Sequence, residues 1–347
     1  MEVAINNHAR IVVVGGGIMG CGLLYHLAEE GCTDIVLIEK GQLTSGSTWH
    51  AVGQCPNLIG DYNLAKIHAY SINLYPRLEE LTGQYVSWHA SGSIRLALTQ
   101  EDLDWFRYLR GMAENIGFRM EIIGVDEIKN LNPFFDTTGV LAGAWTLDDG
   151  HADPAGLCNA MARGATNMGA KIVKHNRVTD IRLLPSGEWE VVTEKGSVVA
   201  EMVVNAAGCY ARQVSQMVGT DLPISNMQHQ YLVTGPIQEF VDREEEIPVM
   251  RDPYASAYLR QEQKSGLIGI YEQTNMAEAW MPQGYPSWES DSELFPEDLE
   301  RLMPWLSRAM ERMPLFEQAG LKRLVNGAIS HSADGAPLLG QIGRAHV

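Results

Sequence analysis

The chain has 347 residues, of which 45% are hydrophobic and 20% charged, as in an ordinary globular protein large enough for two domains. Its 43 acidic and 26 basic residues give a net charge of −17, which argues against nucleic acid or an anionic membrane as a partner. No apolar run approaches the roughly 18–20 residues of a membrane span, and MEVAINNHAR lacks the character of a targeting segment. Five scattered cysteines without a CxxC pair indicate reduced thiols, with neither a disulfide framework nor a metal site. We therefore expect a cytoplasmic protein, or one of the mitochondrial matrix if the source is eukaryotic.

Residues 10–40 form the first predicted unit, a strand, a helix and a second strand. RIVVVGGG (10–17) reads as a buried strand that runs into glycines, and IMGCGLLYHLAEEGC (18–32) as a helix. DIVLIEK (34–40) reads as the second buried strand. Unbroken apolar strands of this kind suit a parallel sheet that is covered on both faces.

Further elements follow along the chain. Helices are predicted at 63–82, 101–117, 126–133, in the first half of 153–184 and at 296–313. Strands are predicted at 91–99 and in the second half of 153–184, a hairpin running into a buried strand at 187–208, and an antiparallel sheet within 220–275.

This order predicts a mixed α/β fold, a Rossmann-type nucleotide-binding domain with an inserted antiparallel-sheet substrate domain. The nucleotide-binding domain is assigned 8–85, 145–222 and an incomplete third segment, 318–341. The substrate domain is assigned 86–144 and 223–317.

Gly15, Gly17 and Gly20 form a GxGxxG pattern directly after the first strand and at the start of the helix. The first glycine permits a tight turn, the second lets the backbone approach a pyrophosphate, and the third lets the helix pack on the strand. Glu39 ends the second strand, where a carboxylate accepts hydrogen bonds from ribose hydroxyls and repels a 2′-phosphate. The pattern predicts bound FAD or NAD and argues against NADP.

The loop TSGSTWHAVG (44–53) favours FAD, because small residues leave room along the backbone for a flavin. Hydroxyls and amides that can bond to phosphate or ring edges come from Thr44, Ser45, Gly46, Ser47 and Thr48. His50 has two interpretations. Its ring nitrogen can bond covalently to the 8-methyl carbon of the flavin, or it is a loop histidine hydrogen-bonded to the backbone.

Six stretches together resemble the FAD-binding half of the dimethylglycine and sarcosine dehydrogenase family, within the D-amino-acid-oxidase-like group. They are VVVGGGIMGCGLLYHLAEEG, VLIEKGQLTSGSTWHAVG, DGHADPAGL, VVNAAGCYARQVSQMVG, MQHQYLVT and AYLRQE. The resemblance extends over about residues 9–340, and GSTWH and QHQY are far more specific than GxGxxG. It implies that FAD is the cofactor and that His50 carries it covalently.

The resemblance also implies which residues surround the FAD. Val178 contacts the adenine end through its backbone, and Ala206, Ala207 and Gly208 close over the ADP. The expected cofactor-binding residues are Gly15, Gly17, Ile18, Met19, Gly20, Glu39, Lys40, Ser45, Gly46, Ser47, Thr48, His50, Ala51, Gly53, Val178, Ala207 and Gly208.

The chemistry that the resemblance implies is oxidative demethylation of an N-methyl amino acid of the dimethylglycine or sarcosine type. A hydride passes from the methyl carbon to flavin N5, and water hydrolyses the resulting iminium to formaldehyde and the demethylated amine. A histidine or tyrosine beside the nitrogen can accept a proton and orient its lone pair. His229 of QHQY and Tyr258 of AYLRQE are the catalytic candidates.

Three assignments stay open at this point. His229 has the alternative of a satisfied buried histidine. Tyr254 and Tyr231 lie close to Tyr258 in the sequence. Arg260 and Arg251 are both candidates for binding the substrate carboxylate.

The expected electron acceptor is an electron-transfer flavoprotein or oxygen. Family members continue into a folate-binding half that these residues do not contain, and residues 342–347 (IGRAHV) do not resemble the family, so we expect them to be a non-native tail. Three other functions remain: another amino-acid oxidase of the same fold, a non-enzymatic regulatory subunit that kept the fold, and an NAD-dependent dehydrogenase.

Overall fold

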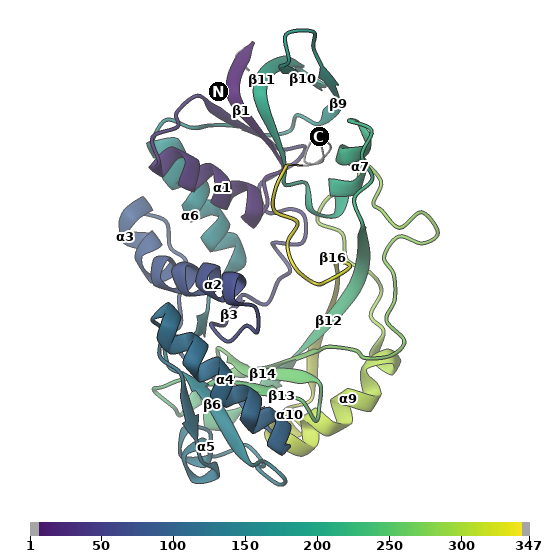
Figure 1. Ribbon diagram of the computed structural model, residues 1–347. Coiled ribbons are helices and arrows are strands. Elements are labelled where there is room, and N and C mark those ends of the chain that lie inside the picture. Colours follow the sequence, from purple (N-terminus) through teal and green to yellow (C-terminus); the bar gives the residue numbers. More distant parts are fainter. Residues whose placement is uncertain (1–6, 342–347) are drawn as a thin grey trace.

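The computed structural model describes residues 7–341, so the prediction for 342–347 lies outside the described residues. Two large sheets and one small sheet form the framework, and the predicted mixed α/β class is confirmed (Figure 1). Within residues 7–341 no helix is both long and apolar enough to cross a membrane. All five cysteines lie in the described part of the chain as free thiols.

The first sheet has six strands, of which four are parallel neighbours and two form an antiparallel extension. Their spatial order is β8 (Lys171–Val173), β2 (Ile35–Ile38), β1 (His8–Val14), β11 (Gly196–Asn205), β10 (Trp189–Thr193) and β9 (Val178–Leu183). On one face α1 (Ile18–Glu29) packs beside α6 (Pro154–Asn167) (Figure 1). α3 (Leu78–Thr82) packs against α6 in turn. The carboxyl ends of β1 and β2 therefore lie where α1 begins.

The second sheet has eight strands and is antiparallel except where β13 pairs with β4. Their spatial order is β16 (Leu321–Ser332), β12 (Ile224–Pro236), β15 (Ser265–Ile270), β14 (Ala257–Glu262), β13 (Val249–Asp252), β4 (Ser93–Ala97), β6 (Ala142–Thr146) and β5 (Glu121–Ile123). The long strands β12 and β16 run from the first sheet's side of the molecule towards α9 (Leu299–Arg312) (Figure 1). The remaining two-stranded sheet joins β3 (Gln54–Cys55) to β7 (Gly150–His151).

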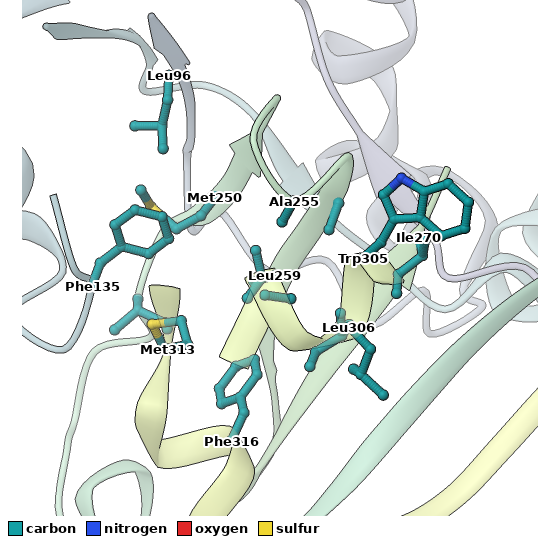
Figure 2. Close-up of a cluster of buried hydrophobic side chains, with 14 of the residues drawn as sticks. Leu96, Phe135, Met250, Ala255, Leu259, Ile270, Trp305, Leu306, Met313 and Phe316 are labelled. Carbon is teal, nitrogen blue, oxygen red and sulfur yellow. The ribbon is translucent and has the colours of Figure 1, made fainter. Parts of the chain in front are cut away.

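Alternation along these strands gives the second sheet two different faces, because successive side chains of a strand point to opposite sides. One face is a hydrophobic core beneath α9 and α10 (Pro314–Ala319), where Figure 2 shows Met250 beside Phe135, Ile270 beside Trp305, and Leu259 above Phe316. The opposite face of the sheet carries the side chains that alternate with these core residues along each strand. α4 (Gln100–Ile116) covers its far end with Phe106 and Leu109.

The remaining helices are short connections apart from α2. They are α2 (Tyr62–Leu74), η1 (Tyr75–Arg77), α5 (Val125–Leu131), α7 (Ala211–Gln216), α8 (Gln238–Val241) and η2 (Gly208–Tyr210). The predicted helix at 63–82 is divided into α2, η1 and α3, because Pro76 cannot donate a backbone hydrogen bond inside a helix.

The last strand, β16, belongs to the larger sheet. It is hydrogen-bonded to β12 from Leu321 to Ser332. A strand's sequence determines its alternation but not its partner, so this pairing could not be inferred from the residues. The domain boundaries, including the assignment of 318–341, stay predictions.

Candidate functional site

The glycine turn after β1 is as tight as the GxGxxG pattern predicts. Gly15 has φ of 112°, and a Cβ on it would lie 2.4 Å from the carbonyl oxygen of Ala206. A Cβ on Gly20 would lie 2.0 Å from the carbonyl oxygen of Gly15. Gly17 is the N-cap of α1, and Met19, in the first turn of this helix, is exposed. A helix N-terminus at a turn of this kind attracts an anion through its dipole and backbone N–H groups.

Glu39 lies beside this turn at the end of β2. Its carboxylate accepts hydrogen bonds from the backbone N–H groups of Gly16 and Gly41, both at 2.7 Å. The backbone N–H of Asn176 donates to the carbonyl of Glu39, which brings the start of β9, and with it Val178, to the same edge of the sheet. These contacts hold an acidic group where a ribose would follow a pyrophosphate.

Lys40 and the residues after β11 are held by other parts of the chain. The Lys40 ammonium donates to the backbone carbonyls of Ser290 and Trp288 and lies 5.0 Å from the centre of the Tyr210 ring. Ala207 donates its N–H to the side chain of Asn205, and Gly208 opens η2 with φ of 55°. Lys40 is thus directed towards the 285–293 segment.

The 44–53 loop joins the glycine turn to the larger sheet. The Thr48 hydroxyl accepts a hydrogen bond from the N–H of Ile18 at 3.1 Å, and the Ser47 hydroxyl donates to the carbonyl of Ala328 in β16 at 2.5 Å. Ser45 is partly buried, whereas Gly46 and Ala51 are exposed. Gly53 ends the loop with φ of 71°, where a Cβ would lie 1.9 Å from the carbonyl oxygen of Ala152.

His50 lies in this loop against β16. Only 8% of it is exposed, and a Cβ on Gly327 would lie 2.3 Å from its Cε1 atom and 2.4 Å from its Nδ1 atom. Burial lowers the pKa of His50 and outweighs a backbone hydrogen bond that acts in the opposite direction. The imidazole is therefore neutral near pH 7, with a lone pair on one ring nitrogen.

The register of β16 brings His229 to the same place, since His229 is the partner of Gly327. Burial lowers the pKa of His229 to about 4, and the nearby charges of His331, His50 and Arg301 add to that effect. The 44–53 loop therefore meets the larger sheet, on the face opposite its α9 core, at two neutral imidazoles.

Aromatic side chains continue this face beyond His229. The rings of His229 and Tyr271 are stacked at 5.5 Å, and Tyr271 meets Tyr258 edge to face at 5.5 Å. Tyr258 lies across Gly269, where a Cβ would come within 2.0 Å of its hydroxyl oxygen. Burial raises the pKa of Tyr258 well above its usual range. His229 and Tyr258 are thus linked by their ring contacts to Tyr271.

The two arginine candidates have different surroundings. Arg260 is buried and bound to the carboxylate of Glu262 at 2.6 Å and to the carbonyl of Val52 at 3.2 Å. Arg251 donates to the Tyr271 hydroxyl at 3.3 Å, and its strand partner is Arg95. Burial is the largest cause that lowers the pKa of Arg95, and the positive charge of Arg251 is the second. Within residues 7–341 neither Arg251 nor Arg95 has a carboxylate within ion-pair distance.

Sequence reasoning missed Tyr271, Gly327 and Arg95. Tyr271 directly follows the apolar strand SGLIGI, and Gly327 interrupts the strand LKRLVNGAISHS. A glycine inside a strand is a signal of close approach by another group, so Gly327 could have been marked, although its neighbour could not.

A family model described as FAD dependent oxidoreductase matches residues 10–347, and the chain belongs to this family. It is 42% identical over 337 residues to the mitochondrial dimethylglycine dehydrogenase of Rattus norvegicus, covering 96% of this chain and 39% of that protein. It is 33% identical over 344 residues to the mitochondrial sarcosine dehydrogenase of Homo sapiens, covering 96% of this chain and 36% of that protein. The predicted resemblance is confirmed.

Among solved structures, L-proline dehydrogenase from P. horikoshii superimposes with a TM-score of 0.83 at 26% identity, covering 97% of this chain and 86% of that chain. The chain spans about two fifths of the length of the two curated relatives named above.

Proposed function

We propose that this chain is the FAD-dependent half of an enzyme that oxidatively demethylates an N-methyl amino acid of the dimethylglycine or sarcosine type. The observation that carries the proposal is the meeting of His50, from the nucleotide side, with Gly327 and His229 on the face of the larger sheet opposite its α9 core. A reacting group held beside His50 faces the side chains that would hold the substrate.

The residues at the glycine turn fit FAD. Gly15, Gly17 and Gly20 leave no side chain between α1 and a pyrophosphate, and Glu39 would bind ribose hydroxyls. The remaining cofactor contacts would come from the 44–53 loop, the start of β9 and the turn after β11. Bound FAD supplies a two-electron hydride acceptor. His50, whose neutral ring packs against Gly327, would be the covalent attachment point for the flavin.

The substrate nitrogen must lose its proton before its lone pair can assist oxidation of the methyl carbon. His229 resists a proton because its pKa is about 4, and Tyr258 resists losing one because burial raises its pKa. His229 and Tyr258 would therefore both remain neutral, and the site around them would disfavour charged groups. A desolvated site of this kind lowers the pKa of a bound ammonium group and favours the free amine. His229 would then accept or direct a hydrogen bond, and Tyr258 would remain a neutral phenol.

Arg251 is the better candidate for the substrate carboxylate. Arg260 is already neutralised by Glu262, whereas Arg251 and Arg95 are neighbouring cations without an ion-pair partner in the described chain. An anion between or beside them would relieve their mutual repulsion. Arg251 also bonds to Tyr271, the ring that stacks on His229. A carboxylate at Arg251 would thus hold the amine end towards His229.

The expected products are formaldehyde and the demethylated amine. The electrons would pass to an electron-transfer flavoprotein or to oxygen, and a folate-binding half in the full-length protein would receive the one-carbon unit. We place the reaction in a reducing compartment, the cytoplasm or the mitochondrial matrix, in keeping with five free thiols.

The test is to purify the chain, precipitate it with acid, and ask whether yellow colour and flavin fluorescence stay with the pellet. His50→Ala should lose this acid-stable flavin, and His68→Ala, whose ring bonds to the carbonyl of Pro56, should keep it. Sarcosine and dimethylglycine should then reduce the flavin and release formaldehyde. Flavin that stays in the supernatant would exclude the covalent attachment. Oxidation without formaldehyde would favour another amino-acid oxidase, and flavin without turnover would favour a regulatory subunit.

A further inference from the structure

Two histidines and a glutamate meet beside the small β3–β7 sheet, apart from the residues assigned to FAD or substrate. His151 belongs to β7, His89 to the connection between α3 and β4, and Glu246 to the connection before β13. His89 Nδ1 lies 2.9 Å from Glu246 Oε1, and His151 Nε2 lies 2.9 Å from Glu246 Oε2. One ligand atom of each residue lies within 4.8 Å of the other two.

The backbone holds the two imidazoles in place. His89 and His151 form an antiparallel bridge with N–H···O distances of 2.8 and 3.0 Å, and their rings are stacked at 4.6 Å with an angle of 10°. Gly150 permits this approach, because a Cβ there would lie 2.1 Å from the carbonyl oxygen of His89. The two rings are therefore oriented without help from Glu246.

The polar partners of the two rings leave one nitrogen of each ring facing the glutamate. Ser87 Oγ lies 3.0 Å from His89 Nε2, so this nitrogen has a partner of its own while Nδ1 faces Glu246. His151 presents Nε2 to the other oxygen of the same carboxylate.

The residues around the cluster leave its donor atoms to one another. Arg260 is the nearby positive charge acting on His151, and Glu262 balances it at 2.6 Å. The cluster presents one carboxylate and two imidazoles, the donor types that zinc takes in proteins.

We propose that His89, His151 and Glu246 form a divalent-metal site of the zinc class, with water as a further ligand. Zinc takes imidazole nitrogen and carboxylate oxygen at about 2.0–2.2 Å in a tetrahedral arrangement, which places ligand atoms about 3.4 Å apart. To reach this spacing, the widest separation of up to 4.8 Å would close by about 1.4 Å, and the 2.9 Å distances between ring nitrogen and carboxylate oxygen would widen by about 0.5 Å. The His89 side chain is 37% exposed and provides the route of entry, whereas the His151 side chain is 8% exposed.

A metal here would join three separate segments of the chain. β7 pairs with β3, and Ala152 donates its N–H to the carbonyl of Gly53 at the end of the 44–53 loop. Metal binding would therefore stabilise the chain that continues from that loop. This site does not depend on the proposed demethylation, because it needs neither FAD nor substrate.

The test measures zinc directly. The purified full chain, stripped with a chelator, is dialysed against Zn²⁺ and analysed for metal by mass spectrometry. We expect stoichiometric zinc in the native chain, with an affinity reduced by about tenfold or more in His89→Asn and in Glu246→Gln. His8→Asn is the matched control, since His8 forms an exposed contact with Glu188 at 3.2 Å. It should bind zinc as the native chain does.

Zinc should also raise the thermal unfolding midpoint of the native chain and leave that of the two variants unchanged. Circular dichroism confirms that each variant is folded before it is compared. The proposal is overturned if the native chain takes up no stoichiometric zinc. It is equally overturned if folded His89→Asn and Glu246→Gln both retain the native affinity, or if His8→Asn loses zinc as they do.

Discussion

The imidazole of His50 occupies the space that a Cβ on Gly327 would fill. The distances from such a Cβ would be 2.3 Å to Cε1, 2.4 Å to Nδ1 and 2.8 Å to Cγ. The two residues come from opposite ends of the chain, and their contact joins the nucleotide side to the sheet that carries His229. The packing of one glycine therefore determines where the proposed flavin-bearing ring can lie.

Gly327→Ala is expected to displace His50 and to reduce acid-stable flavin by about tenfold, with a stability loss of about 1–3 kcal/mol from overpacking. Gly327 does not have a positive φ, so the backbone tolerates alanine and the effect arises from the contact alone. The measurement is flavin fluorescence of the acid precipitate per mole of protein. Gly111→Ala is the control, because a Cβ there has open space around it. Full covalent flavin in Gly327→Ala would show that the contact does not position His50.

Arg251→Gln is expected to weaken binding of an N-methyl amino acid by about 10- to 100-fold, as the loss of a charged hydrogen bond of about 1.5–3 kcal/mol implies. The readout is KM for sarcosine compared with that for an N-methyl amino alcohol, which has no carboxylate. Only the first should change. Arg243→Gln is the control, since Arg243 lies on the surface and bonds to the carbonyl of Glu245. An equal rise in KM for both substrates would assign Arg251 a structural role.

Local signals in the sequence were sufficient to predict the tight glycine turn and the place of Glu39 at the end of β2. Both follow from a strand, a turn and a helix that are adjacent in the chain, and the sequence within that unit determines its geometry. The strand-like pieces separated by Pro and Gly within 220–275 likewise indicated an antiparallel sheet as a class, although β14 and β15 are buried on both faces.

Contacts between distant strands could not be predicted. Tyr271 reaches His229, and Gly327 reaches His50, only because β12 pairs with β15 on one side and with β16 on the other in a particular register. A shift by one residue would turn each of these side chains to the core face. The same limit explains why the pairing of β16 could not be predicted and why Arg251 and Arg260 could not be distinguished.

The pKa of His229 predicts how stability depends on pH. The unfolded chain binds a proton below about pH 6.5, whereas the folded chain does so only near pH 4. The free energy of unfolding therefore falls as the pH falls through this window, by at most about 3 kcal/mol for this residue. His229→Gln should reduce the loss between about pH 7 and pH 4 by about 2–3 kcal/mol. Urea unfolding at both pH values measures it, and an unchanged loss would contradict the buried, neutral state of His229.

Arg312 joins α9 to the core beneath the site. Its guanidinium bonds to the buried carboxylate of Asp252 at 3.0 Å and to the carbonyls of Asp136 and Thr138 at 2.9 and 2.7 Å. Arg312→Met would leave that carboxylate buried without its cation, which costs about 3–5 kcal/mol. Arg212→Met is the control, because the Arg212–Asp221 pair is exposed to solvent and contributes little to stability. Urea unfolding of both variants should give losses that differ by several-fold. Equal losses would mean that the Asp252 carboxylate finds another partner or becomes protonated when Arg312 is removed.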